Sequence, residues 1–530
     1  MVCFNLLTDV VNPMQPKHHE HHVEKYLFLL ACVVSVLPVW LPRFPPMVDL
    51  PQHAAQIALF LNLQDANFPF AHLFDTHLFT PYLFGYSLIA VFTPWLGVVA
   101  ASKLVISIAL AVFPLATRYF LRAASADPYL AWFVFPALYG FSYQWGFINF
   151  IVAAPIGLLF LSLVWRQKRQ TNLRSALLMT CMLYLLFFSH VLILALFGGI
   201  AAIYWWCSAE RIKEFLHLAW PLATPLPLLI AWVAVTQGHP MSKLPIEWDL
   251  SWFSTIDSYY VFMASWITPE QAGWGRVNGF IPRLLGVRPS IIMTIFGVML
   301  FLLPLLAGYR MTTSRTRLIP LGVIVAVLLF SPSLFFGVAF VFQRFTFLAL
   351  PFFLLALDAP RVVTRRYQQL LGGLAPIIAF SWIALMANHA LQFHKEAEGF
   401  DTILAKMVPG KRALSMIFER DDGHSIAPTF VHFAAWYSAL KNGVTDPSFA
   451  ITQVQPITYR PDQRPTVRTQ GFEWFPQKFD WQYHAGRQYD YFVARAPIDH
   501  GVFLFREATC SIELVAQAGH WWLYHRDSGC

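Results

Sequence analysis

Charged residues are scarce in this chain of 530 residues. Asp, Glu, Lys and Arg together make up 12% of the sequence, whereas roughly 25% is usual for a soluble domain. Hydrophobic residues make up 57%, and the mean hydropathy is +0.52. This balance excludes an ordinary soluble globular protein and indicates an α-helical polytopic membrane protein.

Sequence signatures of common cofactor sites are also missing. The chain has no phosphate-binding glycine loop, no dinucleotide-binding fingerprint, no zinc-ligand spacing and no clear internal repeat. Its six cysteines are scattered, and Cys510 and Cys530 are candidates for a disulfide in an oxidising compartment. The net charge of +8 comes mostly from short basic joints between apolar runs, so it predicts contact with membrane lipids and no binding to nucleic acid.

Apolar runs long enough to cross a bilayer recur along the chain. Because roughly 20 apolar residues cross the hydrocarbon layer, we expect about eleven transmembrane helices. The expected spans are 26–42, 101–122, 128–144, 147–166, 174–190, 191–207, 215–236, 290–309, 317–335, 337–357 and 369–391.

Basic residues occur at every second boundary between these spans. They are Arg118 and Arg122, then Arg166, Lys168, Arg169 and Arg174, then Arg211 and Lys213, then Arg310, Arg315 and Arg317, then Arg361, Arg365 and Arg366. Because such joints stay cytoplasmic, we expect a cytoplasmic N-terminal tail, 1–25, and outer loops at 43–100 and 237–289. The apolar run 78–96 then lies on, or dips into, the outer interface, since a span there would invert every later joint. The alternative that it crosses the membrane stays open.

The composition changes after the last expected span. Residues 392–530 have the make-up of a water-soluble module, with alternating runs at 413–418 and 489–495 and a helical pattern at 429–440. We therefore expect a transmembrane domain over 26–391 and a small C-terminal α/β domain outside the cytoplasm.

Asp49 stands just after the first expected span, and two interpretations of it are compatible. In the first, Asp49, Pro51 and Gln52 resemble a capping box that opens an amphipathic helix ending near Leu63. In the second, the carboxylate takes a proton from an acceptor hydroxyl at the membrane surface, as a general base.

Arg344 falls inside an expected span, where inserting an arginine costs roughly 2.5–3.5 kcal/mol. It therefore needs a partner. A lipid-linked phosphate would meet that need, as would the carbonyl groups of another helix, and the sequence leaves both open. Arg283, in the second outer loop, is a weaker candidate for binding phosphate.

Histidines gather near the same expected surface. His53 and His77 share the first outer loop with Asp75, and His190 lies at the outer end of a span. Such a group suits a divalent metal ion or the hydroxyls of a sugar, while hydrogen-bonded structural histidines are the alternative. Sequence spacing does not decide between them, so no metal ligand is assigned.

The order of these parts resembles the GT-C superfamily of membrane glycosyltransferases, and in particular its aminoarabinose-transferase type. The resemblance rests on the run Asp49-Leu50-Pro51-Gln52-His53-Ala54-Ala55-Gln56-Ile57-Ala58, on Pro81-Tyr82-Leu83-Phe84-Gly85-Tyr86 and on Arg344-Phe345-Thr346-Phe347-Leu348-Ala349-Leu350-Pro351. It implies a polyprenyl-phosphate sugar as donor and two juxtamembrane helices in the first outer loop. Many members carry two near-adjacent acids in this loop, whereas Asp49 stands alone here, so dependence on a metal ion stays open.

These observations lead to one functional prediction. We expect an inverting glycosyltransferase with Asp49 as general base, and we expect substrate contacts from His53, Asp75, His77, Tyr82, His190, Arg283 and Arg344. The acceptor would be a lipid, glycan or protein on the extracytoplasmic side, and the resemblance implies the bacterial inner membrane. Two alternatives stay open: a transporter or flippase of a lipid-linked substrate, and a non-catalytic membrane scaffold.

Overall fold

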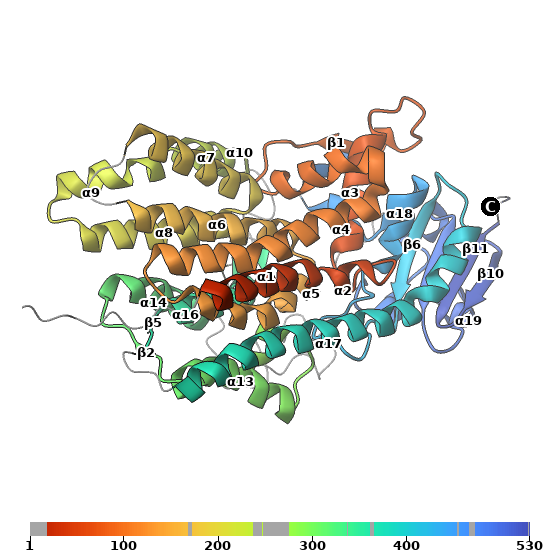
Figure 1. Ribbon diagram of the computed structural model, residues 1–530. Helices are drawn as coiled ribbons and strands as arrows, with labels where there is room; N and C mark the ends of the chain where they lie inside the picture. The colour runs from red at the N-terminus through yellow and green to blue at the C-terminus, as the bar shows by residue number, and fades with distance from the viewer. Residues whose placement is uncertain are drawn as a thin grey trace, which may run out of the picture.

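The protein is elongated, with a bundle of helices at one end and a β-sheet at the other (Figure 1). The computed structural model describes residues 18–167, 172–236, 275–335, 338–360, 365–452, 455–465 and 472–527, together with Ile246, Trp248 and Gly529. Helices predominate because an apolar segment can satisfy all its backbone hydrogen bonds internally only as a helix.

The α-helices are α1 (His18–Val34), α2 (Leu37–Trp40), α3 (Leu50–Asn62), α4 (Leu83–Ala123), α5 (Phe141–Gln144), α6 (Ile148–Arg166), α7 (Leu173–Ser189), α8 (Val191–Ser208), α9 (Ile212–Ala219), α10 (Leu226–Thr236), α12 (Phe280–Leu285), α13 (Ile291–Leu306), α14 (Arg315–Phe330), α15 (Val341–Arg344), α16 (Ala349–Leu355), α17 (Arg365–Lys406), α18 (Trp436–Lys441) and α19 (Gly501–Leu504). The strands are β1 (Phe74–Thr76), β2 (Arg310–Met311), β3 (Leu334–Phe335), β4 (Val338–Ala339), β5 (Leu357–Asp358), β6 (Arg412–Ile417), β7 (Val444–Asp446), β8 (Ile457–Tyr459), β9 (Tyr491–Arg495), β10 (Ile512–Ala518) and β11 (Trp521–Arg526).

Within the described residues, five helices are long and apolar enough to cross a membrane. They are His22–Trp40, Leu83–Ala123, Ile148–Arg166, Val191–Ser208 and Gly372–Lys406. The pair Ile212–Ala223 and Leu226–Val235, bent by 46°, would make a sixth. Leu173–Ser189, Ile291–Leu306 and Thr346–Leu355 are shorter apolar helices. A membrane-embedded helical bundle is therefore supported, but the expected count of about eleven spans is not confirmed.

Two of the expected spans are not single α-helices. Residues 128–144 form a 3₁₀-helix, Pro128–Tyr139, followed by α5. Residues 337–357 contain the end of a β3–β4 hairpin and three short helical pieces, broken where Phe340 has a φ of 58°. Most side chains in both segments are buried in protein. Irregular backbone is tolerated at membrane depth only where protein surrounds it, so hydropathy alone could not reveal these breaks.

Helix α4 contains, from Leu83 onward, the apolar run 78–96 that we expected to lie at the outer interface. Gly97 has φ 74° and ψ 156°, a non-helical conformation that divides α4 into two helical parts. This conformation is essentially restricted to glycine. The predicted interfacial helix is thus the first part of α4 and continues, through a kink, into the next long helix.

The C-terminal strands form a mixed five-stranded sheet in the order β10-β11-β9-β6-β7. Strand β6 runs parallel to both β7 and β9, while β11 is antiparallel to β9 and β10. Strands β6 and β9 match the alternating runs predicted at 413–418 and 489–495. The helix predicted at 429–440 is a turn, a 3₁₀-helix at Phe433–Ala435 and then α18. Cys510 is disulfide-bonded, while Cys530 lies outside the described residues.

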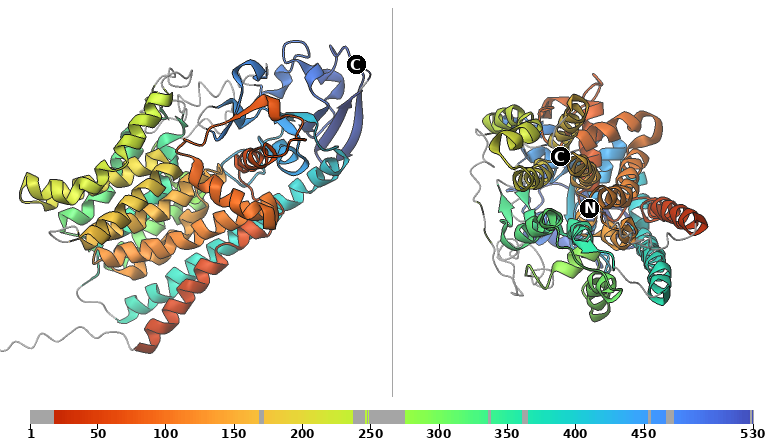
Figure 2. Two further views of the ribbon diagram at one scale, coloured as in Figure 1. Left: turned by 90° about the horizontal axis from the view of Figure 1, so that it is seen from above. Right: turned by 60° about the vertical axis from the view of Figure 1, so that its left-hand side comes forward.

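Helix α17 joins the bundle to this sheet. It runs beside α1 in the bundle and continues to the sheet (Figures 1 and 2). At its far end it packs closely on β10, since a Cβ atom at Gly399 would lie 2.3 Å from the carbonyl oxygen of Ala518. The helix therefore passes without a break through residue 391, where the sequence predicts a domain boundary.

The first outer loop also packs against the C-terminal part of the chain. Strand β1 pairs with β8, with Asp75 opposite Thr458. Helix α3 lies beside α18 (Figure 1). These contacts bring residues that are almost 400 positions apart to one junction.

Candidate active site

One polar face of α3 forms the centre of this junction. Asp49, Gln52, His53 and Gln56 have the spacing of residues that share a helix face. The amide of Gln52 donates to the carbonyl of Pro447 at 2.7 Å and accepts from the backbone N–H of Phe449 at 3.0 Å. Gln56 accepts from the backbone N–H of Ile457 at 3.1 Å. The face therefore holds the C-terminal segments in place through hydrogen bonds.

Asp49 occupies the N-cap position of α3 but does not cap it. Its side chain makes no capping hydrogen bond, and Gln52 is engaged with the C-terminal segment instead. The capping-box interpretation is therefore wrong. The carboxylate oxygen Oδ1 instead accepts a hydrogen bond from Nδ1 of His432 at 3.0 Å. Oδ2 has no hydrogen bond within the described residues, and the side chain is 11% exposed.

His432 bridges two carboxylates. Its Nε2 lies 2.6 Å from Oε1 of Glu473, while its Nδ1 faces Asp49. Burial works against the charged imidazolium, but the negative charges and hydrogen bonds of Glu473 and Asp49 outweigh it and raise the pKa of His432 to about 10. At neutral pH both ring nitrogens therefore carry protons and donate.

His53 has the opposite character, although it lies on the same face of α3. Burial lowers its pKa to about 4; the charges of His432 and Arg344 act in the same direction, and that of Asp49 acts against them. Its Nδ1 lies 2.5 Å from the hydroxyl of Tyr86, which donates to Gln455 at 2.7 Å. His53 is therefore a neutral imidazole in a buried chain of hydrogen bonds.

Arg344 closes the other side of the site. It ends the short helix α15, and its guanidinium lies over the ring of Phe147, with Cζ 3.6 Å from the ring centroid. Its Nε donates to the carbonyl of Ala339 at 3.0 Å, and its Nη1 lies 3.4 Å from Nε2 of His190. The ring of Tyr82 packs edge-on against His190 with 5.0 Å between centroids.

The segment 145–147 places Asp49 and Arg344 near each other. The backbone N–H of Asp49 donates to the carbonyl of Trp145 at 3.1 Å, and Phe147 lies under Arg344. Between them, a Cβ atom at Gly146 would lie 3.0 Å from the backbone nitrogens of Asp49 and Leu50, and Gly146 has a φ of 77°. Only glycine fits this approach without strain. Consistent with this proximity, the charges of both Asp49 and Arg344 act on His53.

Three of the predicted site residues lie away from this group. Asp75 is half-exposed and pairs with Arg460 at 3.1 Å. His77 is exposed, and its backbone N–H donates to Pro456 at 2.7 Å. Arg283, in α12, is buried, donates to the carbonyl of Gly275 at 3.1 Å, and lies over the ring of Phe342. The structure thus groups Asp49, His53, Tyr82, His190 and Arg344.

A metal site is not found in the part of the chain that the structure describes. It contains no group of three or more His, Cys, Asp or Glu side chains arranged to hold an ion. Asp75 and His77, candidates for such a group, are turned to solvent instead.

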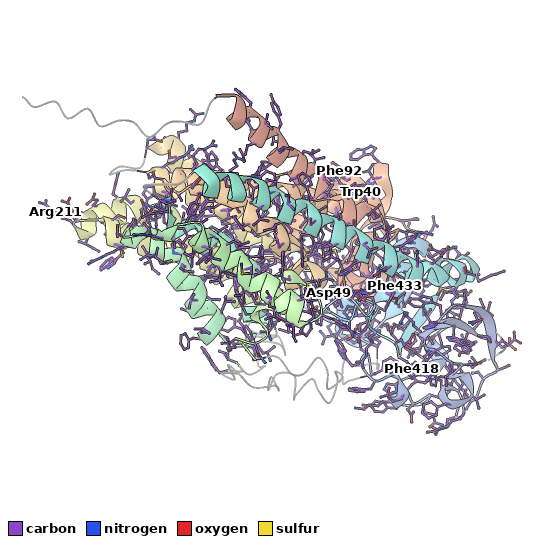
Figure 3. All side chains as sticks on the ribbon, turned by 60° about the horizontal axis from the view of Figure 1, so that its bottom comes forward. Trp40, Asp49, Phe92, Arg211, Phe418 and Phe433 are labelled. Atoms are coloured by element: carbon purple, nitrogen blue, oxygen red, sulfur yellow. The ribbon has the colours of Figure 1, made fainter. Side chains whose placement is uncertain are left out.

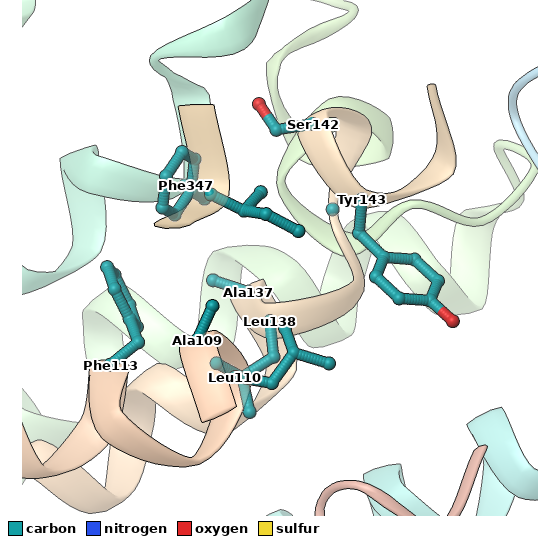
Figure 4. Close-up of a pocket in the computed structure, with 10 residues that line it drawn as sticks. Ala109, Leu110, Phe113, Ala137, Leu138, Ser142, Tyr143 and Phe347 are labelled. Atoms are coloured by element: carbon teal, nitrogen blue, oxygen red, sulfur yellow. The ribbon is translucent and has the colours of Figure 1, made fainter. Parts of the chain in front are cut away.

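A small cavity lies beside the site (Figure 4). It is lined by residues of the segment 137–143, by three apolar side chains of α4, and by Ile151 of α6 and Phe347. Ser142, on its wall, donates a hydrogen bond to the carbonyl of Arg344 at 2.7 Å. Its volume of about 10 Å³ is room for no more than a single water molecule.

His432 and Glu473 were missed by the sequence analysis. Both stand alone among aromatic and aliphatic residues, His432 between Val431 and Phe433 and Glu473 between Phe472 and Trp474. A titratable side chain in such a setting is a signal for a buried polar partner. Nothing in the local sequence, however, points to Asp49 as that partner.

Comparison with known proteins identifies a solved structure with the same fold. No protein-family model matches the sequence, and no curated protein matches it. Among solved structures, the crystal structure of ArnT from Cupriavidus metallidurans in the apo state matches with a TM-score of 0.52 and 12% sequence identity, over 95% of this chain and 97% of that one. The chain has the fold of ArnT. This finding confirms, at the level of the fold, the resemblance to the aminoarabinose-transferase type of GT-C architecture.

Proposed function

We propose that this protein is a membrane glycosyltransferase of the GT-C type. In our proposal it moves a sugar from a polyprenyl-phosphate donor to a lipid, glycan or protein acceptor on the extracytoplasmic side, with inversion at the anomeric carbon. The ArnT fold supports the enzyme class. The observation that carries the mechanism is the placement of one carboxylate, Asp49, and one guanidinium, Arg344, on either side of the segment 145–147.

Asp49 serves as the general base in this mechanism. Its Oδ1 is held by His432, so Oδ2 is the oxygen that takes the proton from the acceptor hydroxyl. As that proton leaves, the acceptor oxygen forms a bond to the anomeric carbon of the donor sugar. General bases placed in this way contribute about 10²- to 10⁴-fold to rate.

Arg344 stabilises the leaving group. When the bond from the anomeric carbon to the phosphate oxygen breaks, the polyprenyl phosphate gains negative charge, and a guanidinium fork stabilises that charge as it develops. His190 and Tyr82, packed beside Arg344, orient the donor. A phosphate is a good leaving group, so one base and one cation suffice for the exchange.

The arrangement of charges supports an extracytoplasmic site. Arg211, from one of the basic joints, lies at the far end of the helical bundle from Phe418 of the C-terminal part, and Asp49 lies between them (Figure 3). Basic joints stay in the cytoplasm. We therefore propose an integral protein of the bacterial inner membrane whose C-terminal part faces the periplasm or the cell exterior.

Substitution of Asp49 tests this function. We expect purified Asp49→Asn to lose sugar transfer by about 10²-fold or more, measured against a panel of polyprenyl-phosphate sugars, because the amide cannot accept the proton. Asp75→Asn is the matched control, since Asp75 is a half-exposed surface residue paired with Arg460. Full turnover in a folded Asp49→Asn variant would rule out Asp49 as the base, and movement of the intact donor across the bilayer without transfer would identify a flippase instead.

A further inference from the structure

The contact between Asp49 and the C-terminal part of the chain is an ion triad. His432 precedes the 3₁₀-helix Phe433–Ala435, and Glu473 lies in a turn between β8 and β9. Their side chains are 7% and 15% exposed, so the pair is largely removed from water. Two carboxylates and one imidazolium carry a net charge of −1 at this place.

Among the described residues, three titratable groups face His432. Asp49 and His53 approach it from α3, and Glu473 approaches it from the C-terminal part. The edge of the Phe449 ring packs against it, with ring centroids 5.2 Å apart. The same Phe449 ring lies 5.5 Å from the ring of His53, so it contacts both histidines.

Charge determines what His432 is able to do. A neutral histidine between two carboxylates would accept a proton through one nitrogen and relay it, as in a serine-protease triad. With both nitrogens protonated, His432 has no lone pair with which to accept the proton that Asp49 takes from the acceptor. It can only donate to Oδ1 and hold the carboxylate in one orientation.

We propose that His432, which contacts Asp49 through Nδ1 and Glu473 through Nε2, is a positioning residue that fixes Asp49 so that Oδ2 receives the acceptor proton. This inference rests on the proposed function, because it assigns His432 and Glu473 to the same site. It also assigns a role in transfer to the C-terminal part of the chain, which contributes both residues.

Glu473→Gln provides the sharpest test of this role. The substitution keeps the size of the side chain and removes one of the two negative charges that sustain the imidazolium. As the pKa of His432 falls toward its ordinary value of about 6.5, the doubly protonated fraction declines roughly tenfold for each pH unit above the new pKa. We therefore expect kcat of Glu473→Gln to fall steeply between pH 7 and 9, where wild-type kcat stays nearly constant.

The Michaelis constant separates positioning from general damage. Because His432 acts through Asp49, we expect the KM for the donor to change by less than about twofold while kcat falls. Glu513→Gln is the matched control, since Glu513 is exposed on β10 in the same part of the chain. We expect its pH profile to coincide with that of the wild type.

Direct titration of His432 distinguishes this inference from the proposed function. In NMR spectra of histidine-labelled protein in detergent, we expect one ring, absent from His432→Gln, to titrate near pH 10 in the wild type and at lower pH in Glu473→Gln. A ring that titrates near pH 6.5 in the wild type would overturn the inference even if sugar transfer is intact. Titration near pH 10 with no transfer from any donor would overturn the proposed function instead. A pH profile of Glu473→Gln that matches the wild type would also overturn the inference, because the triad would then be a structural contact with no role in transfer.

Discussion

The charge state of single residues in this protein depends on the groups that surround them. His53 and His432 lie close together, yet burial leaves one neutral while two carboxylates keep the other charged. The same residue type therefore has two different electrostatic roles at one junction, which no count of histidines in the sequence could separate. Arg344 is a third case, because a guanidinium placed among buried residues keeps its charge and must be matched by its surroundings.

Arg344→Gln should reduce sugar transfer strongly. We expect kcat to fall by about 10²- to 10³-fold, the usual cost of removing a group that stabilises charge in the transition state. Arg344→Lys should retain part of the activity, because it keeps the charge and loses the planar fork. Purified variants assayed with a fixed donor provide the measurement.

The matched control for Arg344 is Arg460→Gln. Arg460 is a half-exposed arginine that pairs with Asp75 on the surface, so its loss should leave kcat within about twofold of the wild type. Equal losses in both variants would show that the effect is not specific to the site.

The elements show a similar contrast between local and distant information. The residues of α3 predict a helix that starts near Asp49 and ends near Leu63, and the structure has it at Leu50–Asn62. The sequence also predicts its polar face. It does not predict the partners of that face, because Gln52 and Gln56 contact residues about 400 positions away, and His53 is connected through Tyr86 to Gln455. A helical pattern in the sequence predicts which residues share one face of a helix. It does not predict which segment packs against that face.

Gly97 sets the direction of the first part of α4, and its substitution tests that role. Gly97→Ala should destabilise the protein by about 1–3 kcal/mol, because its φ and ψ suit glycine alone. Apart from the neighbouring residues of α4 itself, no atom of the described residues lies within 4 Å of the Cβ position, so the cost would come from the backbone and not from a clash. Unfolding of the purified protein in a denaturing detergent measures the change.

Gly199, inside α8, is the control for Gly97. It too has open space at its Cβ position, but it lies within α8 and not at a break in the helix. Gly199→Ala should therefore be neutral or stabilise the protein by about 0.5–1 kcal/mol. A Gly97→Ala variant as stable as Gly199→Ala would contradict the assigned role of the kink.

At the scale of the whole molecule, the chain has two ends of different chemistry. The basic joint at Arg211 marks the far end of the bundle, and the mixed sheet marks the opposite end, with Asp49 between them (Figure 3). Helix α17 extends over 42 residues from one part to the other. The site therefore lies where the bundle meets the sheet, and both parts contribute to it.

Cysteine labelling tests this orientation. Val502, 90% exposed in α19, and Leu173, 70% exposed at the start of α7, report on the two ends. With a membrane-impermeant maleimide on intact cells, we expect Val502→Cys to be labelled at once and Leu173→Cys only after permeabilisation. Labelling of both from the same side would contradict the proposed topology.

The background for this experiment replaces the exposed residues Cys181 and Cys207 with alanine. The same background without an added cysteine is the blank, which accounts for signal from the remaining cysteines. Cys32 is buried, so it should contribute little to that signal.

Composition and periodicity predicted that the helical bundle lies in lipid, and they predicted its long apolar helices, strands β6 and β9 and the position of Asp49 after the first helix. These signals act over short stretches of chain. The sequence also marked Arg344 through the cost of placing a cation among apolar residues. The irregular backbone in 128–144 and 338–357 could not be predicted from these signals, since irregular backbone persists at membrane depth only where surrounding protein satisfies its hydrogen bonds. The contact of Asp49 with His432 was likewise beyond the sequence, because these two residues, 383 positions apart, meet only when the C-terminal part packs on α3.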